Sequence, residues 1–153
     1  MNFISLKSML TPSVLAFALT LSLFAPGSGA GAQTPTLHLV ADIPFDFRSG
    51  SEMMPAGKYD IQTLSTHILI VRGTTQSRSQ LLVARHAVTA KPSDHGKLVF
   101  HRYGNKYFLY QVWSPGQSNG FEFPKGHAEK EAIRAANTPA PTKTELALNE
   151  SLR

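Results

Sequence analysis

Apolar and polar residues alternate along residues 37–48, and this period of two is the clearest structural pattern in the chain. The apolar positions are Leu37, Leu39, Ala41, Ile43, Phe45 and Phe47, and only Val40 interrupts the polar positions between them. Alternation of this kind predicts a β-strand with one buried face. Because Pro44 cannot donate a ladder hydrogen bond, the second half of the segment is expected to be an edge or a bulge.

The second strong pattern is at 96–116, where two runs rich in Val, Phe and Tyr flank Gly104-Asn105. Glycine accepts the positive φ of a tight hairpin loop, so this pair predicts a two-residue turn that fixes the register. In that register Tyr103 opposes Lys106, and the pairing continues without interruption to Val99 opposite Tyr110.

Two faces of the predicted hairpin follow from this register. One face carries Val99, His101, Tyr103, Phe108, Tyr110 and Val112, and the other carries Leu98, Phe100, Arg102, Tyr107, Leu109, Gln111 and Trp113. Both faces are substantially apolar, whereas a solvated antiparallel hairpin alternates cleanly. The hairpin is therefore expected to be central, with one face on a β core and the other under a second layer or a ligand.

Further strands are predicted at 58–64, 67–72, 80–90 and 121–123. The segment 80–90 contains Leu, Ala and Arg, which suit a helix, but Val83, Val88 and Thr89 and its strand-rich surroundings favour a strand. Residues 124–137 predict a helix that begins at a proline. Its narrow apolar stripe consists of Ala128, Ala132, Ile133 and Ala136.

These elements predict an all-β, mainly antiparallel fold, a barrel or sandwich of six to eight strands with a C-terminal α-helix. The expected organisation is a signal peptide over 1–32, a β domain over 33–123, the helix over 124–137 and a flexible tail over 138–153.

The amino terminus has the features of a secretory signal peptide. Lys7 is its only charge, an apolar run follows, and Ala30-Gly31-Ala32 supplies small residues before Gln33, so cleavage is expected after Ala32. A retained membrane anchor is the weaker alternative because the run is short and contains a proline. The protein is therefore expected to be periplasmic or secreted, and with no cysteine it must be stabilised by packing rather than by disulfides.

The charges disfavour a nucleic-acid partner. The formal net charge is +5, but the basic residues between Arg72 and Lys106 are spread over several predicted elements. Nucleic-acid-binding proteins usually gather such residues on one face. Attraction to anionic polymers of the cell envelope stays open.

The sequence contains no recognisable catalytic, metal or cofactor motif. The six histidines show no HxH or HExxH spacing and have no cysteine partners, so neither a metal nor a cofactor is expected. Asp42 and Asp46 share a strand face, but four residues of strand span roughly 13 Å, beyond the roughly 5–9.5 Å of glycosidase carboxylate pairs. They are better explained as solvated charges.

The candidate ligand-binding residues lie on the predicted hairpin. Arg102 and Tyr107 oppose each other beside Phe100 and Trp113, which predicts a cationic and aromatic platform for an anionic or sugar ligand. His101 is a further candidate ligand-binding residue because it lies within the opposite, aromatic face of the predicted hairpin. The alternative is that the arginine stem packs on aromatic rings and its head reaches solvent.

Three segments, IPFDFRSGSEMMPAGKY, KPSDHGKLVFHRYGNKYFLYQVW and PKGHAEKE, together resemble a family of small exported bacterial β-domain proteins of uncharacterised function. The resemblance covers about residues 40–132. It implies a compact β domain after a signal peptide and a charged helix near the carboxyl end, and it brings no activity or functional residues.

The sequence therefore predicts a non-enzymatic interaction or ligand-binding module of the cell envelope, with an unknown envelope partner or small ligand. The alternative is a hydrolase-type enzyme that acts on an envelope or extracellular substrate through Asp42, Asp46, His101 or Arg102. A third hypothesis makes the predicted helix the partner-binding element.

Overall fold

The computed structural model describes residues 37–136 and 140–148, so the expected signal peptide lies outside the described residues. Within these ranges the chain forms eleven strands and one helix. The strands are β1 (His38–Ile43), β2 (Phe47–Ser49), β3 (Glu52–Met54), β4 (Gly57–Ser65), β5 (Ile68–Gly73), β6 (Ser79–Val83), β7 (Arg85–Val88), β8 (Lys97–Tyr103), β9 (Lys106–Trp113), β10 (Asn119–Glu122) and β11 (Thr142–Ala147), and the helix is α1 (His127–Ala136).

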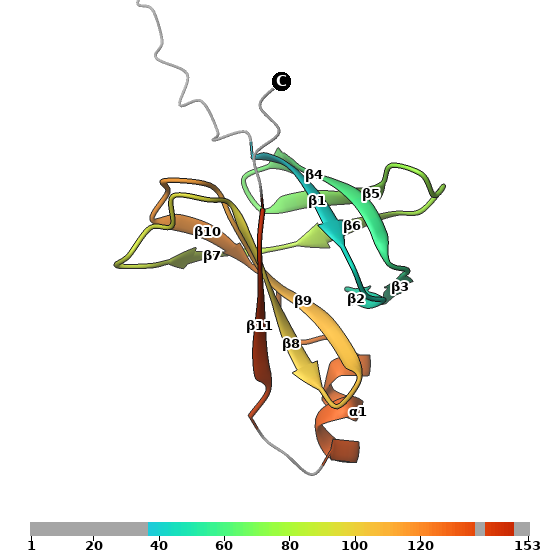
Figure 1. The fold of residues 1–153 in the computed structure, drawn as a ribbon. Helices are drawn as coiled ribbons and strands as arrows, with labels where there is room; N and C mark the ends of the chain where they lie inside the picture. Colours follow the sequence, from blue (N-terminus) through green and yellow to red (C-terminus); the bar gives the residue numbers. More distant parts are fainter. Residues whose placement is uncertain (1–36, 137–139, 149–153) are drawn as a thin grey trace, which may run out of the picture. The chain divides into compact units, whose positions relative to one another are not determined.

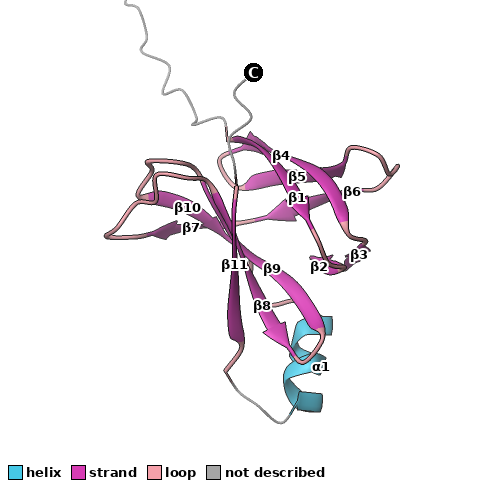
Figure 2. Cartoon of the chain, in the orientation of Figure 1, coloured by secondary structure: helices cyan, strands magenta, loops and turns pink. Residues whose placement is uncertain are grey.

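The strands form two sheets that share one hydrophobic core (Figures 1 and 2). The smaller sheet has the order β1-β4-β5-β6, and the larger has the order β11-β8-β9-β10-β7, with β2 joined to β9 and β3 joined to β2. Only the β2–β9 pair is parallel among the described strands. The core takes Ile43, Tyr59, Ile61, Leu69 and Val71 from the smaller sheet and Leu98, Phe100 and Val112 from the larger.

This arrangement confirms the predicted antiparallel all-β class with a C-terminal helix. It fits a sandwich, since the described strands do not close into a barrel. The described strands are more numerous than the predicted six to eight for two reasons. Two predicted segments each divide where the chain passes from one sheet to the other, and β3 and β11 form where no strand was predicted. In the part of the chain that the structure describes, no helix is long and apolar enough to cross a membrane.

The first of these divided segments is 37–48. Burial alternates along β1 as the pattern predicted, with Leu39, Ala41 and Ile43 buried. The strand ends before Pro44, and β2 continues in the other sheet. Pro44 thus marks the corner between the sheets, as its missing N–H favours.

The second divided segment is 80–90, which the sequence predicted as one strand. It forms β6 in the smaller sheet and β7 in the larger, separated only by the buried Ala84. The strand interpretation is confirmed, and the β-branched residues that favoured it lie in or next to β6 and β7.

The predicted β8–β9 hairpin is present, and its turn glycine, Gly104, has a φ of 61°. The predicted register holds from Tyr103 opposite Lys106 to Phe100 opposite Leu109. It then shifts, because Val99 pairs with Gln111 rather than with Tyr110. Tyr110 is therefore a β-bulge residue, an extra residue in one strand of the pair.

Because of the bulge, the side chains that follow Tyr110 lie on the opposite face of the hairpin from the one predicted. Val112 opposes Leu98 and lies in the core between the sheets, not on the face of His101. Trp113 opposes Lys97 and so shares the face of Val99 and His101, not that of Arg102. A one-residue shift reverses the face of every later side chain in a strand.

The helix covers part of the hairpin's outer face, the face turned away from the smaller sheet. Tyr103 and Phe108 on the hairpin pack with Ala132, flanked by Ala128 and Ile133, which confirms most of the predicted apolar stripe. The predicted Ala136 is exposed. The hairpin is thus covered on both sides, as the double apolar pattern predicted.

The structure differs from the predicted flexible tail over 138–153. Thr142–Ala147 form β11 and pair antiparallel with β8, and Leu148 is buried. Strand pairing depends on a partner distant in sequence, so the local composition, with Pro139 and Pro141, gave no sign of it.

Candidate functional site

A buried acid–base pair joins α1 to the outer face of the hairpin. His101 Nδ1 lies 2.6 Å from Glu129 Oε1, and the Tyr103 hydroxyl donates to the same oxygen at 3.3 Å. His101 is 3% exposed and Glu129 is 5% exposed. Burial, aided by the Glu129 carboxylate, raises the pKa of Tyr103 to about 12, so the hydroxyl stays a donor at neutral pH.

The polar contacts continue along the outer face beyond the bulge. The Tyr110 ring stacks on His101 at 3.7 Å between centroids, and its hydroxyl donates to Glu122 Oε2 at 2.7 Å. Burial and that hydrogen bond raise the pKa of Tyr110 to about 12. Gln111 donates to the same Glu122 oxygen at 2.8 Å and accepts from Trp113 Nε1 at 3.3 Å.

Glu122 is ionised within this network. Burial opposes its ionisation, but hydrogen bonds from Tyr110 and Gln111 and the nearby positive charge of Arg85 outweigh it and hold the pKa of Glu122 below its usual value. The side chains form a continuous set of partners, and such networks fix packing geometry when every member is satisfied.

This network fits a structural role better than a chemical one. His101 is buried and lines neither of the two cavities described below. Glu129 belongs both to this network and to a cavity wall. No group of three or more side chains suited to hold a metal ion occurs within 37–136 and 140–148.

The structure brings together only two of the four predicted ligand-binding residues. The Arg102 guanidinium lies 5.4 Å from the centre of the Tyr107 ring and donates through Nε to Gly104 O at 2.7 Å. Tyr107 also stacks on Phe45 at 4.0 Å. His101 and Trp113 lie on the opposite face, so the predicted platform of Arg102, Tyr107 and Trp113 is not formed as one surface.

The carboxylate pair and the other residues of the enzyme alternative do not converge. Asp46 Oδ1 accepts from Ala56 N–H at 2.7 Å, and Asp42 is exposed on β1. Within the described residues, no hydrogen bond or ion pair joins any two of Asp42, Asp46, His101 and Arg102.

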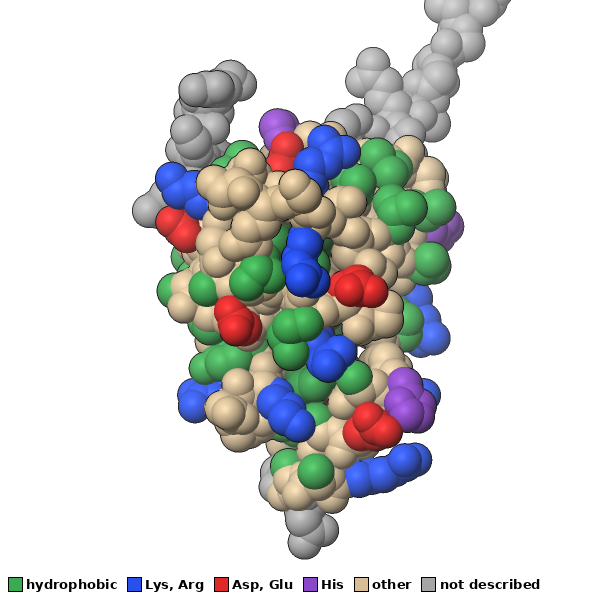
Figure 3. Space-filling model, turned by 90° about the vertical axis from the view of Figure 1, so that its right-hand side faces the viewer, with side chains coloured by type: hydrophobic (Ala, Val, Ile, Leu, Met, Phe, Trp, Pro, Cys, Tyr) green, Lys and Arg blue, Asp and Glu red, His purple; other side chains and the backbone are tan. Residues whose placement is uncertain are grey.

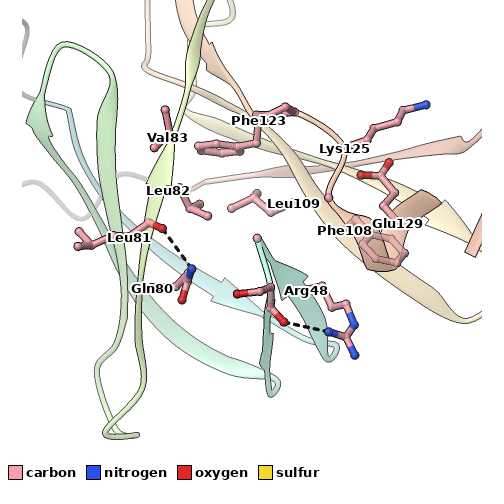
Figure 4. A pocket seen from close by; sticks show the side chains of 14 residues that line it. Arg48, Gln80, Leu81, Leu82, Val83, Phe108, Leu109, Phe123, Lys125 and Glu129 are labelled. Carbon is pink, nitrogen blue, oxygen red and sulfur yellow. Dashed lines mark hydrogen bonds between the residues drawn. The ribbon is translucent and has the colours of Figure 1, made fainter. Parts of the chain in front are cut away.

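The feature that sequence reasoning missed is a cavity beside β6, called here the β6 cavity (Figure 4). Its volume is about 310 Å³, at the lower end of ligand pockets. Its apolar walls are Leu82, Leu109, Phe108 and Phe123, and its charged residues are Arg48, Lys125 and Glu129. In Figure 4, Leu82 of β6 and Leu109 of β9 point toward each other across it.

Two residues of the cavity lining have exposed apolar side chains, although the Leu81 side chain points away from the cavity in Figure 4. Leu81 is 57% exposed and Val83 is 71% exposed, and both belong to its lining. Arg48 Nη1 donates to Ser51 O at 3.0 Å, which anchors this arginine at the cavity. The run Leu81-Leu82-Val83 indicated only a strand, because a local sequence pattern does not reveal which strand edge stays open.

A second cavity, of about 410 Å³, lies along the other side of Phe108, between α1 and the β2–β3 segment. Its lining includes Met53, Tyr107, Ala132 and Ala135, together with the shared Arg48.

Figure 3 shows that basic, acidic and hydrophobic side chains are interspersed on the face it displays, which agrees with the scattered charges of the sequence.

Comparisons with known proteins identify no relative of this chain. No protein-family model matches the chain, and neither the curated proteins nor the solved structures contain a match. The resemblance to a family of small exported bacterial proteins therefore stays a prediction from the sequence.

Proposed function

We propose that the protein is an exported, non-enzymatic interaction module of the cell envelope that binds its partner at the β6 cavity. The observation that carries the proposal is the combination of this cavity with exposed apolar residues and two cationic side chains at its walls. Exposed apolar side chains next to a concave site are typical of binding surfaces. The signal-peptide pattern over 1–32 supports export.

The hydrolase alternative has less support. Its candidate residues are dispersed, and the buried His101–Glu129 pair has a structural partner in Tyr103. The hypothesis that α1 alone is the partner-binding element also has less support, because α1 is fixed to the hairpin through Glu129 and Ala132. Its first turn nevertheless supplies part of the cavity wall.

Export is tested by expressing the full chain in a Gram-negative host and measuring the intact mass of the protein released by osmotic shock. We expect a mature chain that begins at Gln33. Recovery of the uncleaved chain from the cytosol would contradict this part of the proposal.

Binding is tested in the same cells with a benzophenone-bearing amino acid at position 81. The matched control places it at position 40, where Val40 is also exposed but lies on β1, at the other edge of the sheet. We expect a specific photo-adduct at position 81 alone. Equal adducts at both positions, or none at either, would refute binding at the cavity.

A further inference from the structure

The open edge of β6 faces the β6 cavity, and the backbone hydrogen bonds establish its direction. Ala84 N–H donates to His67 O at 2.8 Å, which continues the β5–β6 register. Because these groups alternate in direction along a strand, Leu82 turns its N–H and C=O toward β5. Leu81 and Val83 turn theirs toward the opposite edge, where β6 has no paired strand among the described strands.

β6 continues after Ala84 as β7, and the corresponding edge of β7 is paired with β10. Thr89 N–H donates to Ser118 O at 2.9 Å, so β7 directs its odd-numbered positions toward β10. The edge on which β10 pairs with β7 is therefore the edge left open along β6. β10 ends at Glu122, which pairs with Arg85, before it reaches Val83.

A proline explains why β10 does not continue. In the β7–β10 register the residue opposite Val83 would be Pro124, and even-numbered positions of β10 face β7. Proline has no N–H to donate, and the chain turns away through Lys125 and Gly126 into α1. The β6 cavity is thus the place of a missing strand segment, bounded by β6 on one side and by residues 123–126 on another.

The open edge has few of the features that usually protect one. Its five residues include no proline and no charged side chain, and two of them, Leu81 and Val83, have exposed apolar side chains. One local contact occupies part of the edge, since the Gln80 side-chain amide donates to Leu81 O at 3.2 Å (Figure 4). This side chain imitates the donor that a neighbouring strand would supply.

From these observations we propose that an extended acidic peptide segment of a partner protein adds to β6 as a strand within the β6 cavity. The inference rests on the proposed function and specifies its occupant. Every second residue of the segment is apolar and packs on Leu82 and Leu109, and its backbone bonds Leu81 and Val83. This is strand addition at a sheet edge, in which the main chain supplies affinity and alternate side chains supply specificity.

The positive charges around the cavity are the reason why we expect the bound segment to be acidic. Arg48 and Lys125 line the cavity, and exposed Arg78 and Arg85 flank the two ends of β6. The acidic residue of the lining, Glu129, is already bound to His101 and Tyr103. The cationic side chains therefore complement carboxylates on the segment, which steers association and sets specificity.

The experiment uses the mature chain and a fluorescein-labelled peptide of about ten residues that alternates valine with glutamate. Anisotropy titrations compare the wild type with V83P and V83A. Both variants lose the valine side chain, but only V83P loses the N–H that faces the cavity. We expect V83P to weaken binding at least about tenfold and V83A less than about threefold. Equal effects would overturn strand addition.

A second measurement does not depend on how V83P folds. In the wild type, the peptide should slow amide hydrogen exchange at Leu81 and Val83 and leave Gln80 and Leu82 unchanged, because the latter already face β5. Uniform or absent protection would overturn the proposal. A valine–lysine peptide that binds as tightly as the valine–glutamate peptide would overturn its acidic character.

Two further results separate this inference from the proposed function. A photo-adduct at position 81 together with no effect of V83P would leave binding at the cavity intact and refute strand addition. Concentration-dependent dimerisation that V83P abolishes would make a second copy of the chain the occupant, and it would refute the peptide segment.

Discussion

Removal of the Glu129 carboxylate should destabilise the protein more than any other single change on α1. In Glu129→Ala, His101 and Tyr103 both lose the acceptor that they share within the outer face of the hairpin. A buried donor left without a partner costs about 1–3 kcal/mol, and two buried donors lose their acceptor here. We therefore expect the free energy of unfolding to fall by about 3 kcal/mol.

The assay is urea unfolding monitored by the fluorescence of Trp113, the single tryptophan of the chain. With a denaturant slope of about 1.5 kcal/mol/M, a loss of this size lowers the midpoint by about 2 M. Glu129→Gln preserves the shape and one acceptor oxygen, so its midpoint should fall between those of the wild type and the alanine variant.

Glu131→Ala is the matched control on the same helix. Glu131 pairs with His127 at 3.5 Å, and both side chains are exposed, so its loss should change stability by less than about 0.5 kcal/mol. If the two alanine variants lowered the midpoint equally, the buried pair would not be what fixes α1 to the hairpin. A double-mutant cycle with His101→Phe should give a coupling energy of at least about 1 kcal/mol.

Three other results are expected. Gly120→Ala places a Cβ 2.5 Å from the Trp113 ring and should cost about 1–3 kcal/mol and shift its emission, whereas Gly126→Ala, whose Cβ lies 3.6 Å from the nearest atom, should change neither. The pKa of Tyr103 is raised to about 12, so its contribution to stability is complete below pH about 10 and is lost as the pH rises toward 12; Tyr103→Phe should flatten this alkaline fall in the urea midpoint. The pKa of Glu122 is lowered, so its contribution is present above pH about 4.3 and is lost as the pH falls below it, and Glu122→Gln should flatten the acid fall.

The local elements of this fold could be predicted because each has a local cause. Alternation along 37–48 and the Gly104-Asn105 turn are properties of neighbouring residues, and β1 and the β8–β9 hairpin follow from them. β11 could not be predicted, because its partner β8 lies about forty residues away. Pairings of this kind depend on tertiary context rather than on local propensity.

The bulge at Tyr110 was invisible for a different reason. Register is normally specified because a slip of one residue moves apolar side chains into solvent. In this hairpin both faces are apolar, so either register buries aromatic and aliphatic side chains. The sequence therefore could not decide whether Val112 or Trp113 belongs to the core between the sheets.

The cavity could not be predicted either, although one of its causes is visible in the sequence. Pro124 lies two residues after the end of β10, and the sequence indicated only a helix start there. Pro124 also ends β10 and leaves β6 unpaired. This second effect can be predicted only if β7 and β10 are known to be neighbours. That pairing is a property of the whole sheet.

The bulge also determines how the aromatic residues of the hairpin are packed. By turning Gln111 and Trp113 to the side of His101, it lets a polar network form on the outer face of the hairpin, while Leu98, Phe100 and Val112 on the other side face the smaller sheet. Each aromatic face is then used for packing. In the function that we propose, binding takes place where this packing ends, at the edge of β6, and Glu129 connects the two regions because it both contacts His101 and forms part of the cavity wall.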